Sequence, residues 1–243
     1  MASEDGIEFS RGINSIPSSD ANYTDNYKHI RRTNLLLQNA EAYAKPEDIK
    51  QYIGEAYFFR AYSYFDLLQL YGDVIITKKP LDITDPEMKV KRNDRSEVVD
   101  LIIDDLNHAV ENLPAFKELT TEEEGRISKE GAQAFLSRVA LYEGTWQKSR
   151  NGNQNTQRSA NLLDIAAKAA RTVIDAKYGY TFRLFGTDSE TKILGDSAQK
   201  YMFILENEKS NPAGIKKSSN HEYIFARRHD QVLASIGKNI TQE

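Results

Sequence analysis

The sequence contains no cysteine among its 243 residues, which excludes disulfide frameworks, thiolate zinc sites and cysteine nucleophiles. It also has no long apolar run: nowhere does it reach the roughly 18 consecutive apolar residues that a transmembrane helix requires. Its first residues, MASEDGIEFSRGINS, show no basic region followed by an apolar stretch. As written, the chain is therefore expected to be neither secreted nor membrane-spanning.

A surplus of basic residues is absent as well. Acids outnumber bases by 36 to 32, and the net charge of −4 leaves no electrostatic footprint for a phosphate backbone. Nucleic acid is therefore not expected as a partner. The hydrophobic fraction of 40% is high enough for a sizeable core in a chain of this length, so a globular protein is expected.

The motifs of common catalytic sites are missing too. The chain has no Gly-x-Ser-x-Gly elbow, no Gly-x-Gly-x-x-Gly loop and no Walker pattern. His221 and Glu222 begin a zinc-protease motif, but Phe225 stands where the second histidine is required, one helical turn later. We expect no metal site and no cofactor.

Paired carboxylates for glycoside hydrolysis are not evident either. A glycosidase needs two carboxylates that face one cleft. Asp66, Asp104 and Asp105 lie in helical patterns that offer no such cleft, so we do not expect an enzyme.

What the sequence does contain is a concentration of aromatic residues at 54–72, GEAYFFRAYSYFDLLQLYG. Pro46 and the two acids after it begin a helix, and Gly72 ends it. Apolar side chains fall on nearly every side of this helix. Such a helix is enclosed by neighbours on several faces, so its aromatic residues are predicted to form core and not a ligand platform.

Helices are predicted before and after this segment. The helix before it covers residues 23–42. The helix after it begins at Asp94 to Glu97, which resemble a capping box, and stops at Pro114. Two more helices follow: Ser128 caps one that runs through Trp146, and Ser159 caps one that ends before Gly179. Residues 74–77 form a short extended excursion. The predicted fold class is all-α, with antiparallel helix pairs and little strand.

Two of these helices resemble each other. AYFFRAYSY at 56–64 and AFLSRVALY at 134–142 place small, basic and aromatic residues at the same phases. Helix pairs of this kind are typical of tetratricopeptide-type arrays, which form an α-α superhelix. The recurring Arg60 and Arg138 are interpreted as structural residues that pair with a carboxylate or a helix C-terminus.

Three segments of the chain together resemble a known protein family. AYFFRAYSYFDLLQLYGDVIITKKPLD, then RSEVVDLIIDDLNHAVENLP and GRISKEGAQAFLSRVALYEGTW resemble, in order and spacing, the SusD/RagB family of outer-membrane lipoproteins. The resemblance runs from about Tyr23 through Tyr180, with a weaker continuation at HEYIFARR, residues 221–228. It implies a tetratricopeptide-like scaffold without catalytic activity, which captures oligosaccharides for a SusC-like, TonB-dependent transporter in a starch-utilisation-type nutrient uptake system.

The chain departs from the family at both ends. No signal peptide or lipidated cysteine is present, and the long loop-rich region that follows the helices in family members is largely missing. We interpret the chain as an internal fragment, a truncated gene product or a partial reading frame. An outer-membrane, cell-surface location thus follows from the resemblance alone. The expected parts are a loop segment at 1–22, the helical scaffold at 23–178 and the start of an incomplete loop-rich region at 179–243.

A sugar surface needs exposed aromatic rings beside amide groups, because a ring packs on a pyranose face and amides bond its hydroxyls. Asn22, Tyr23 and Asn26 offer both before the first helix, and Trp146 offers a ring beside the amide-rich loop at 150–157. These four are the candidate ligand-binding residues, although rings in such positions are more often structural, with Tyr23 stapling the first helix and Trp146 capping the core. The alternative function is a tetratricopeptide-type scaffold that binds a peptide or a partner protein.

Overall fold

The computed structural model describes residues 18–226, apart from 83, 121–122, 124, 151–155 and 206–208. Its helices are α2 (Ala21–Glu41), α3 (Lys50–Tyr71), α4 (Arg95–Asn112), α5 (Lys129–Arg150), α6 (Thr156–Ile174) and the short α7 (Ala198–Met202). Within the described ranges, β-pairing is limited to one isolated bridge between Val74 and Asn93. The prediction of an all-α chain is confirmed.

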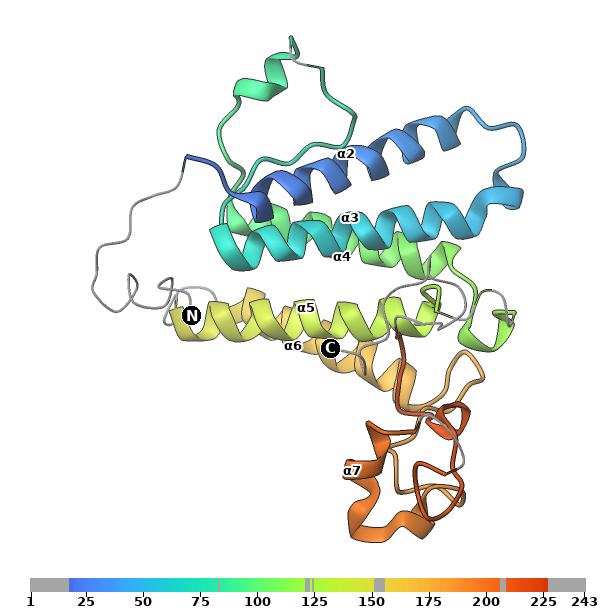
Figure 1. Cartoon of the computed structure of the whole chain (residues 1–243). Helices are drawn as coiled ribbons and strands as arrows, with labels where there is room; N and C mark the ends of the chain where they lie inside the picture. Colours follow the sequence, from blue (N-terminus) through green and yellow to red (C-terminus); the bar gives the residue numbers. More distant parts are fainter. Residues whose placement is uncertain are drawn as a thin grey trace, which may run out of the picture.

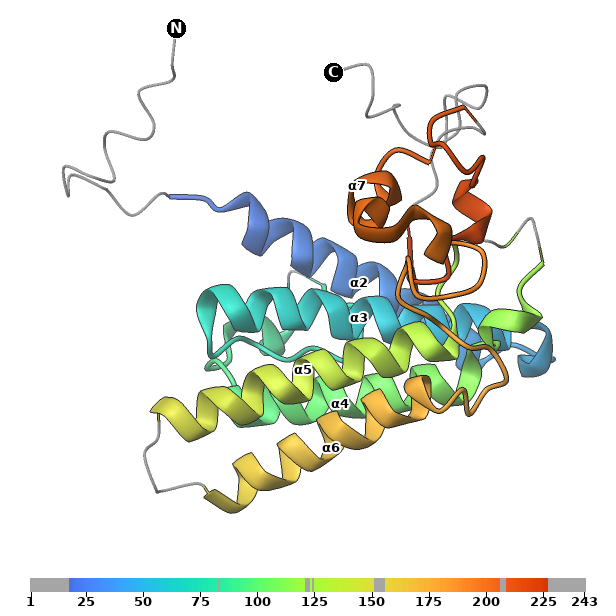
Figure 2. The ribbon, with the colours of Figure 1, turned by 90° about the horizontal axis from the view of Figure 1, so that it is seen from below.

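Each long helix packs against the next one in the sequence, and neighbours run in opposite directions (Figure 1). Seen from below, α3 and α5 lie side by side, with α4 behind them (Figure 2). This succession of antiparallel pairs is the predicted tetratricopeptide-like arrangement. Among the described helices, none combines the length and the apolar character that crossing a membrane demands.

The helix boundaries follow local capping chemistry. The carboxylate of Asp20 accepts a hydrogen bond from the Asn22 backbone and caps α2. The predicted capping box before α4 is confirmed: Asp94 accepts from the Ser96 backbone and donates its own backbone N–H to Glu97.

One predicted cap is confirmed and another is wrong. Ser128 Oγ accepts from the Gly131 backbone at the start of α5, as expected. α6 already begins at Thr156, however, and Ser159 lies inside it, where its hydroxyl donates to the Gly144 carbonyl of α5 at 2.7 Å. Ser159 therefore joins two helices instead of starting one.

The aromatic helix α3 is only partly enclosed. Tyr64, Leu67 and Leu68 are completely buried, as the core interpretation predicted. Phe59 and Tyr62 are 43% and 48% exposed, which corrects the expectation that the aromatic residues of this helix are core. One face of α3 thus carries aromatic rings that the described part of the chain leaves uncovered.

A buried ion pair joins the first three helices. The Arg60 guanidinium of α3 donates to both carboxylate oxygens of Asp105 on α4, at 2.8 and 2.6 Å, and to the Asn34 side chain of α2 at 2.8 Å. Burial raises the pKa of Asp105, and the hydrogen bonds from Arg60 oppose that rise. The predicted structural role of Arg60 is confirmed.

Arg138, the counterpart of Arg60 in the internal sequence repeat, does not form an equivalent buried ion pair. Arg138, which stands at the equivalent place in α5, is exposed. The buried pair to α5 comes instead from Arg95 at the start of α4, whose guanidinium donates to Glu143 at 2.8 Å. Arg60 and Arg138 occupy equivalent positions in the two repeat segments, but the residues packed around them differ.

The excursion after α3 is held by side chains from two helices. The Tyr64 hydroxyl accepts from the Thr77 backbone N–H at 2.8 Å, and the Asn34 amide donates to the Thr77 carbonyl at 2.9 Å. The Tyr27 hydroxyl donates to the Ile75 carbonyl at 2.7 Å. Because buried backbone groups need partners, these bonds fix residues 75–77 against the first helix pair.

After α6 the chain runs through turns and short 3₁₀ helices. They enclose a small second cluster of buried apolar residues, separate from the main core: Phe185, Leu194, Ala198, Leu205 and Ile215. α7 belongs to this part, which lies below α5 and α6 in Figure 1.

Tyr64 gives a direct test of the core. Because its ring is completely buried, Tyr64→Ala is expected to lower the free energy of unfolding by about 3 to 5 kcal/mol in urea titrations. Tyr43→Ala removes a ring that is 49% exposed and should cost less than about 1 kcal/mol. Equal losses for the two variants would contradict the packing described here.

Candidate functional site

The four candidate residues lie toward one end of the helical scaffold. α2 begins there, α3 and α5 end there, and α4 begins there (Figure 1). Tyr23 and Trp146, which are far apart in the sequence, therefore belong to the same end of the molecule.

Tyr23 lies in a group of three tyrosines. Its ring centroid is 4.8 Å from that of Tyr27 and 5.2 Å from that of Tyr71, the second contact being edge-to-face. The side chain is half-buried. Tyr23 therefore helps to join α2 to α3 and still presents part of its ring to solvent.

The two candidate asparagines differ from each other. Asn22 is exposed, whereas Asn26 is 8% exposed and its amide donates to the Asn22 carbonyl at 2.9 Å. The expectation that Asn26 offers its amide to a ligand is therefore corrected: burial and a bond within α2 occupy it.

A hydrogen bond closes this end of the first helix pair. The Tyr71 hydroxyl donates to the carboxylate of Asp20 at 2.5 Å, which links the last residue of α3 to the cap of α2. The bond from Tyr71 lowers the pKa of Asp20, while desolvation and the nearby carboxylate raise the pKa of Tyr71 to about 12. Sequence reasoning missed this pair because the partners are 51 positions apart.

Trp146 lies one turn before the end of α5, among cationic and aromatic neighbours. Its ring is stacked near that of Tyr142, with centroids 6.3 Å apart. The guanidinium carbons of Arg95 and Arg150 lie 4.3 and 5.0 Å from its ring centroid. Both distances are within the range of cation-π interactions, and these interactions hold the half-buried indole in place.

Arg95 connects this ring to the core. Besides its bond to Glu143, it donates to the Leu68 carbonyl at 3.4 Å, near the end of α3. Glu143 is completely buried, and its second oxygen accepts from the Gln147 amide at 2.6 Å. The indole of Trp146 thus rests on a network that ties three helices together. The amide-rich loop beside it lies largely outside the described residues.

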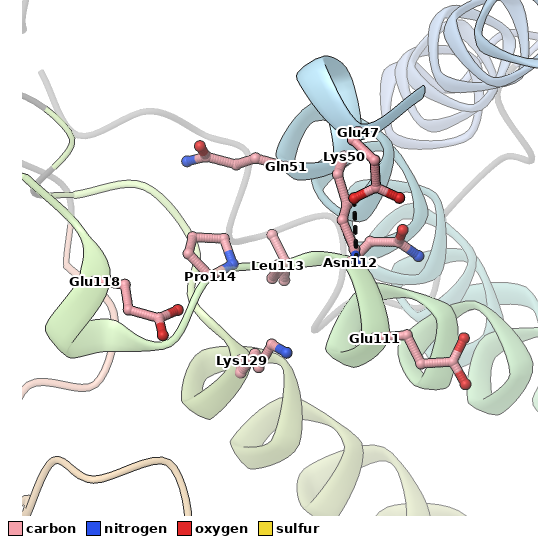
Figure 3. A pocket seen from close by; sticks show the side chains of 9 residues that line it. All are labelled: Glu47, Lys50, Gln51, Glu111, Asn112, Leu113, Pro114, Glu118 and Lys129. Carbon is pink, nitrogen blue, oxygen red and sulfur yellow. Dashed lines mark ion pairs between the residues drawn. The ribbon is translucent and has the colours of Figure 1, made fainter. Parts of the chain in front are cut away.

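A hollow of about 340 Å³ opens at the other end of α3, where α4 ends (Figure 3). Charged and amide side chains line it, among them Lys50, which is 3.7 Å from Glu47. The nine lining residues include no aromatic ring. Since sugar rings pack on aromatic faces, this hollow is a poorer candidate for glycan binding than the opposite end.

No metal-binding cluster forms within the described ranges: no three side chains of the ligating types come together there. His108 is stacked on Tyr57, with ring centroids 4.9 Å apart, and its Nδ1 lies 2.9 Å from the Asp104 carbonyl oxygen of the same helix, an acceptor. His221 lies edge-on to Tyr180. Their positions are explained by packing.

Fold and site together define a class: a tetratricopeptide-like scaffold with partly exposed aromatic rings at one end. A family model for SusD-like proteins, described as starch-binding and associating with the outer membrane, matches residues 10–141. This match covers more than half of the chain, and the chain therefore belongs to the SusD-like family of carbohydrate-binding proteins.

Curated relatives agree with this assignment. SusD-like protein P38 of Formosa agariphila is 33% identical over 133 residues, which are 53% of this chain and 25% of the relative. SusD-like protein P2 of the same organism is 26% identical over 202 residues, or 81% of this chain and 38% of the relative. The chain thus spans about a quarter to two fifths of the length of these relatives.

Solved structures show the same fold. A SusD-like protein from Bacteroides fragilis superposes with a TM-score of 0.61 at 25% identity, over 84% of this chain and 32% of that one. A laminarin-binding SusD-like protein gives 0.54 at 26% identity, over 74% and 36%. A structure with a xylogluco-oligosaccharide gives 0.55 over 84% and 34%, and at 22% identity it supports the fold alone.

The pair of Asp20 and Tyr71 predicts a pH dependence. A lowered pKa of Asp20 stabilises the folded state above pH 3.8, and this contribution is lost as the pH falls through the folded-state pKa. Tyr71→Phe removes the bond. The stability difference between the parent chain and Tyr71→Phe should therefore be largest near neutral pH and shrink below pH 4 in urea titrations. A difference that stays constant down to pH 3 would contradict the bond.

Proposed function

We propose that the protein to which this chain belongs binds oligosaccharides at the outer face of the outer membrane, without cleaving them, and delivers them to a SusC-like, TonB-dependent transporter. The observation that carries the proposal is the family match over residues 10–141. The similarity to a laminarin-binding SusD-like protein supports carbohydrate as the ligand class. In this proposal residues 23–178 are the scaffold and 179–243 begin a further, loop-rich region.

Within this chain, we place the candidate sugar contacts at Asn22, Tyr23 and Trp146. Both rings are half-buried, so each can present an edge or a face while packing holds it in place. The exposed amide of Asn22 stands next to Tyr23 and can bond sugar hydroxyls. An immobilised ring lowers the entropy cost of binding, which favours these rings over those of a flexible loop.

The binding test uses the 243-residue chain with laminarin, xyloglucan and starch oligosaccharides in isothermal titration calorimetry. Trp146→Ala is expected to weaken binding by roughly 5- to 30-fold, as the loss of one stacking ring costs about 1 to 2 kcal/mol. Tyr23→Ala should have a similar effect, and Asn22→Ala a smaller one. Trp146→Phe keeps a ring and should retain part of the affinity.

Each variant is also melted, because both rings contribute to packing. A contact residue changes affinity at a temperature where the variant is folded, and Tyr43→Ala serves as a matched exposed-ring control. If the parent chain binds sugar and the Trp146 and Tyr23 variants bind equally well, the contacts lie elsewhere. If no glycan binds the parent chain, this part of the protein is scaffold only.

The delivery step has its own test. The complete protein, extracted from membranes in mild detergent, is expected to copurify with a TonB-dependent transporter. Copurification with soluble peptide-binding or signalling proteins, and with no transporter, would favour the interaction-scaffold alternative.

A further inference from the structure

Trp146, one of the candidate sugar contacts, has two guanidinium neighbours that differ in their ion pairs. Arg95 donates to completely buried Glu143, and its own side chain is only 14% exposed. Arg150, four positions after Trp146 on α5, is exposed, and no carboxylate of the described residues lies within ion-pair distance of it. The charge of Arg95 is therefore balanced inside the protein, whereas that of Arg150 is available to a ligand.

Hydrogen-bond donors exceed acceptors around the guanidinium groups at this end of the molecule. Arg158 of α6 donates to the Ser96 carbonyl at 3.0 Å and to Asp100 at 2.8 Å, at the start of α4. Arg95 Nη2 and Arg158 Nε are nevertheless buried nitrogens, and neither has an acceptor within the described ranges. Unpaired buried donors are uncommon in proteins. This end of the scaffold thus favours a ligand that is rich in acceptors and negatively charged.

The carboxylates at this end of the scaffold have partners of their own. Both oxygens of Glu143 accept hydrogen bonds inside the core. Asp73, Asp94 and Glu97 all accept from backbone N–H groups at the start of α4. The dipole of that helix favours negative charge at its first turn. Because these acids are already engaged, the partner of Arg150 is expected to come from a bound molecule.

We propose that the saccharide bound at Trp146 carries an oxyanion, either a carboxylate or a sulfate ester, and that Arg150 selects for it. The inference rests on the proposed function and narrows its ligand class. The two residues lie four positions apart and therefore share one side of α5. The guanidinium carbon of Arg150 is 5.0 Å from the centroid of the indole ring. A sugar that packs on the exposed part of the indole thus brings its charged group within reach of the guanidinium, whose planar fork matches an oxyanion.

Trp146 is the only tryptophan of the chain, so its fluorescence reports on binding at this site alone. The full chain is titrated with two matched pairs of ligands. Oligogalacturonate and its methyl ester test the carboxylate, and carrageenan oligosaccharides and their desulfated forms test the sulfate. We expect the charged member of at least one pair to change the fluorescence and to bind about 5- to 20-fold more tightly than its neutral counterpart, because hydrogen bonds to charged groups are the stronger ones. The pair that shows the preference identifies the oxyanion.

The variants separate Arg150 from the general charge of this helix end. Arg150→Gln should reduce the preference for the charged ligand to less than about twofold, and Arg150→Lys, which keeps the charge without the planar fork, should retain part of it. Lys148→Gln is the matched control: it removes one exposed positive charge about 200° around the helix from Trp146, and the preference should remain. Far-ultraviolet circular dichroism checks that each variant remains folded. Added salt should weaken binding of the charged ligands only.

Four outcomes overturn the proposal. Equal affinity within both pairs, or binding of neutral laminarin oligosaccharides alone, removes the charge selection and leaves the proposed function intact. A preference that Arg150→Gln and Lys148→Gln change equally means that Arg150 does not select the ligand. Binding heat in calorimetry without a change in fluorescence places the site away from Trp146. If no saccharide binds, charged or neutral, the sugar contacts proposed for this chain fail together with this inference.

Discussion

The buried charge of Arg60 is the constraint on which the helical scaffold depends. A guanidinium enclosed by three helices must be fully paired, since an unpaired buried charge is strongly destabilising. Asp105 and Asn34 meet this requirement, and they come from the helices on either side of α3. Asn34 in turn holds the backbone at Thr77. One side chain thereby sets the relative positions of α2, α3 and α4 and of the excursion between the last two.

The same logic recurs at the end that carries the candidate sugar contacts. Arg95 pairs with completely buried Glu143, bonds the Leu68 carbonyl near the end of α3, and lies over the indole of Trp146. On the first helix pair, Asp20 caps α2 and accepts from Tyr71. Polar contacts between helices therefore fix the partly exposed rings, which is the arrangement that a preorganised binding surface needs.

Much of the helical scaffold could be predicted from local patterns. Apolar periodicity and the capping chemistry at Asp94 and Ser128 located helices within a few residues, because these signals act over one or two turns. Ion pairs between residues far apart in the sequence have no local pattern from which they could be predicted. The partners Arg60 and Asp105 are 45 positions apart, and the exposed position of Arg138 breaks the symmetry that the repeat suggested. The apolar periodicity of α3 also does not indicate which of its sides lacks a covering neighbour. The exposure of Tyr62 could therefore be learned only from the structure.

The central claim, that Arg60 and Asp105 hold the helix pairs together as one unit, is tested most directly by a double-mutant cycle. The free energy of unfolding is measured in urea for the parent chain, Arg60→Met, Asp105→Leu and the double variant. We expect each single variant to lose about 3 to 5 kcal/mol, and the double variant to lose about 2 to 3 kcal/mol less than the sum of the two. Strictly additive losses would contradict the account, because they would mean that the two side chains stabilise the fold independently.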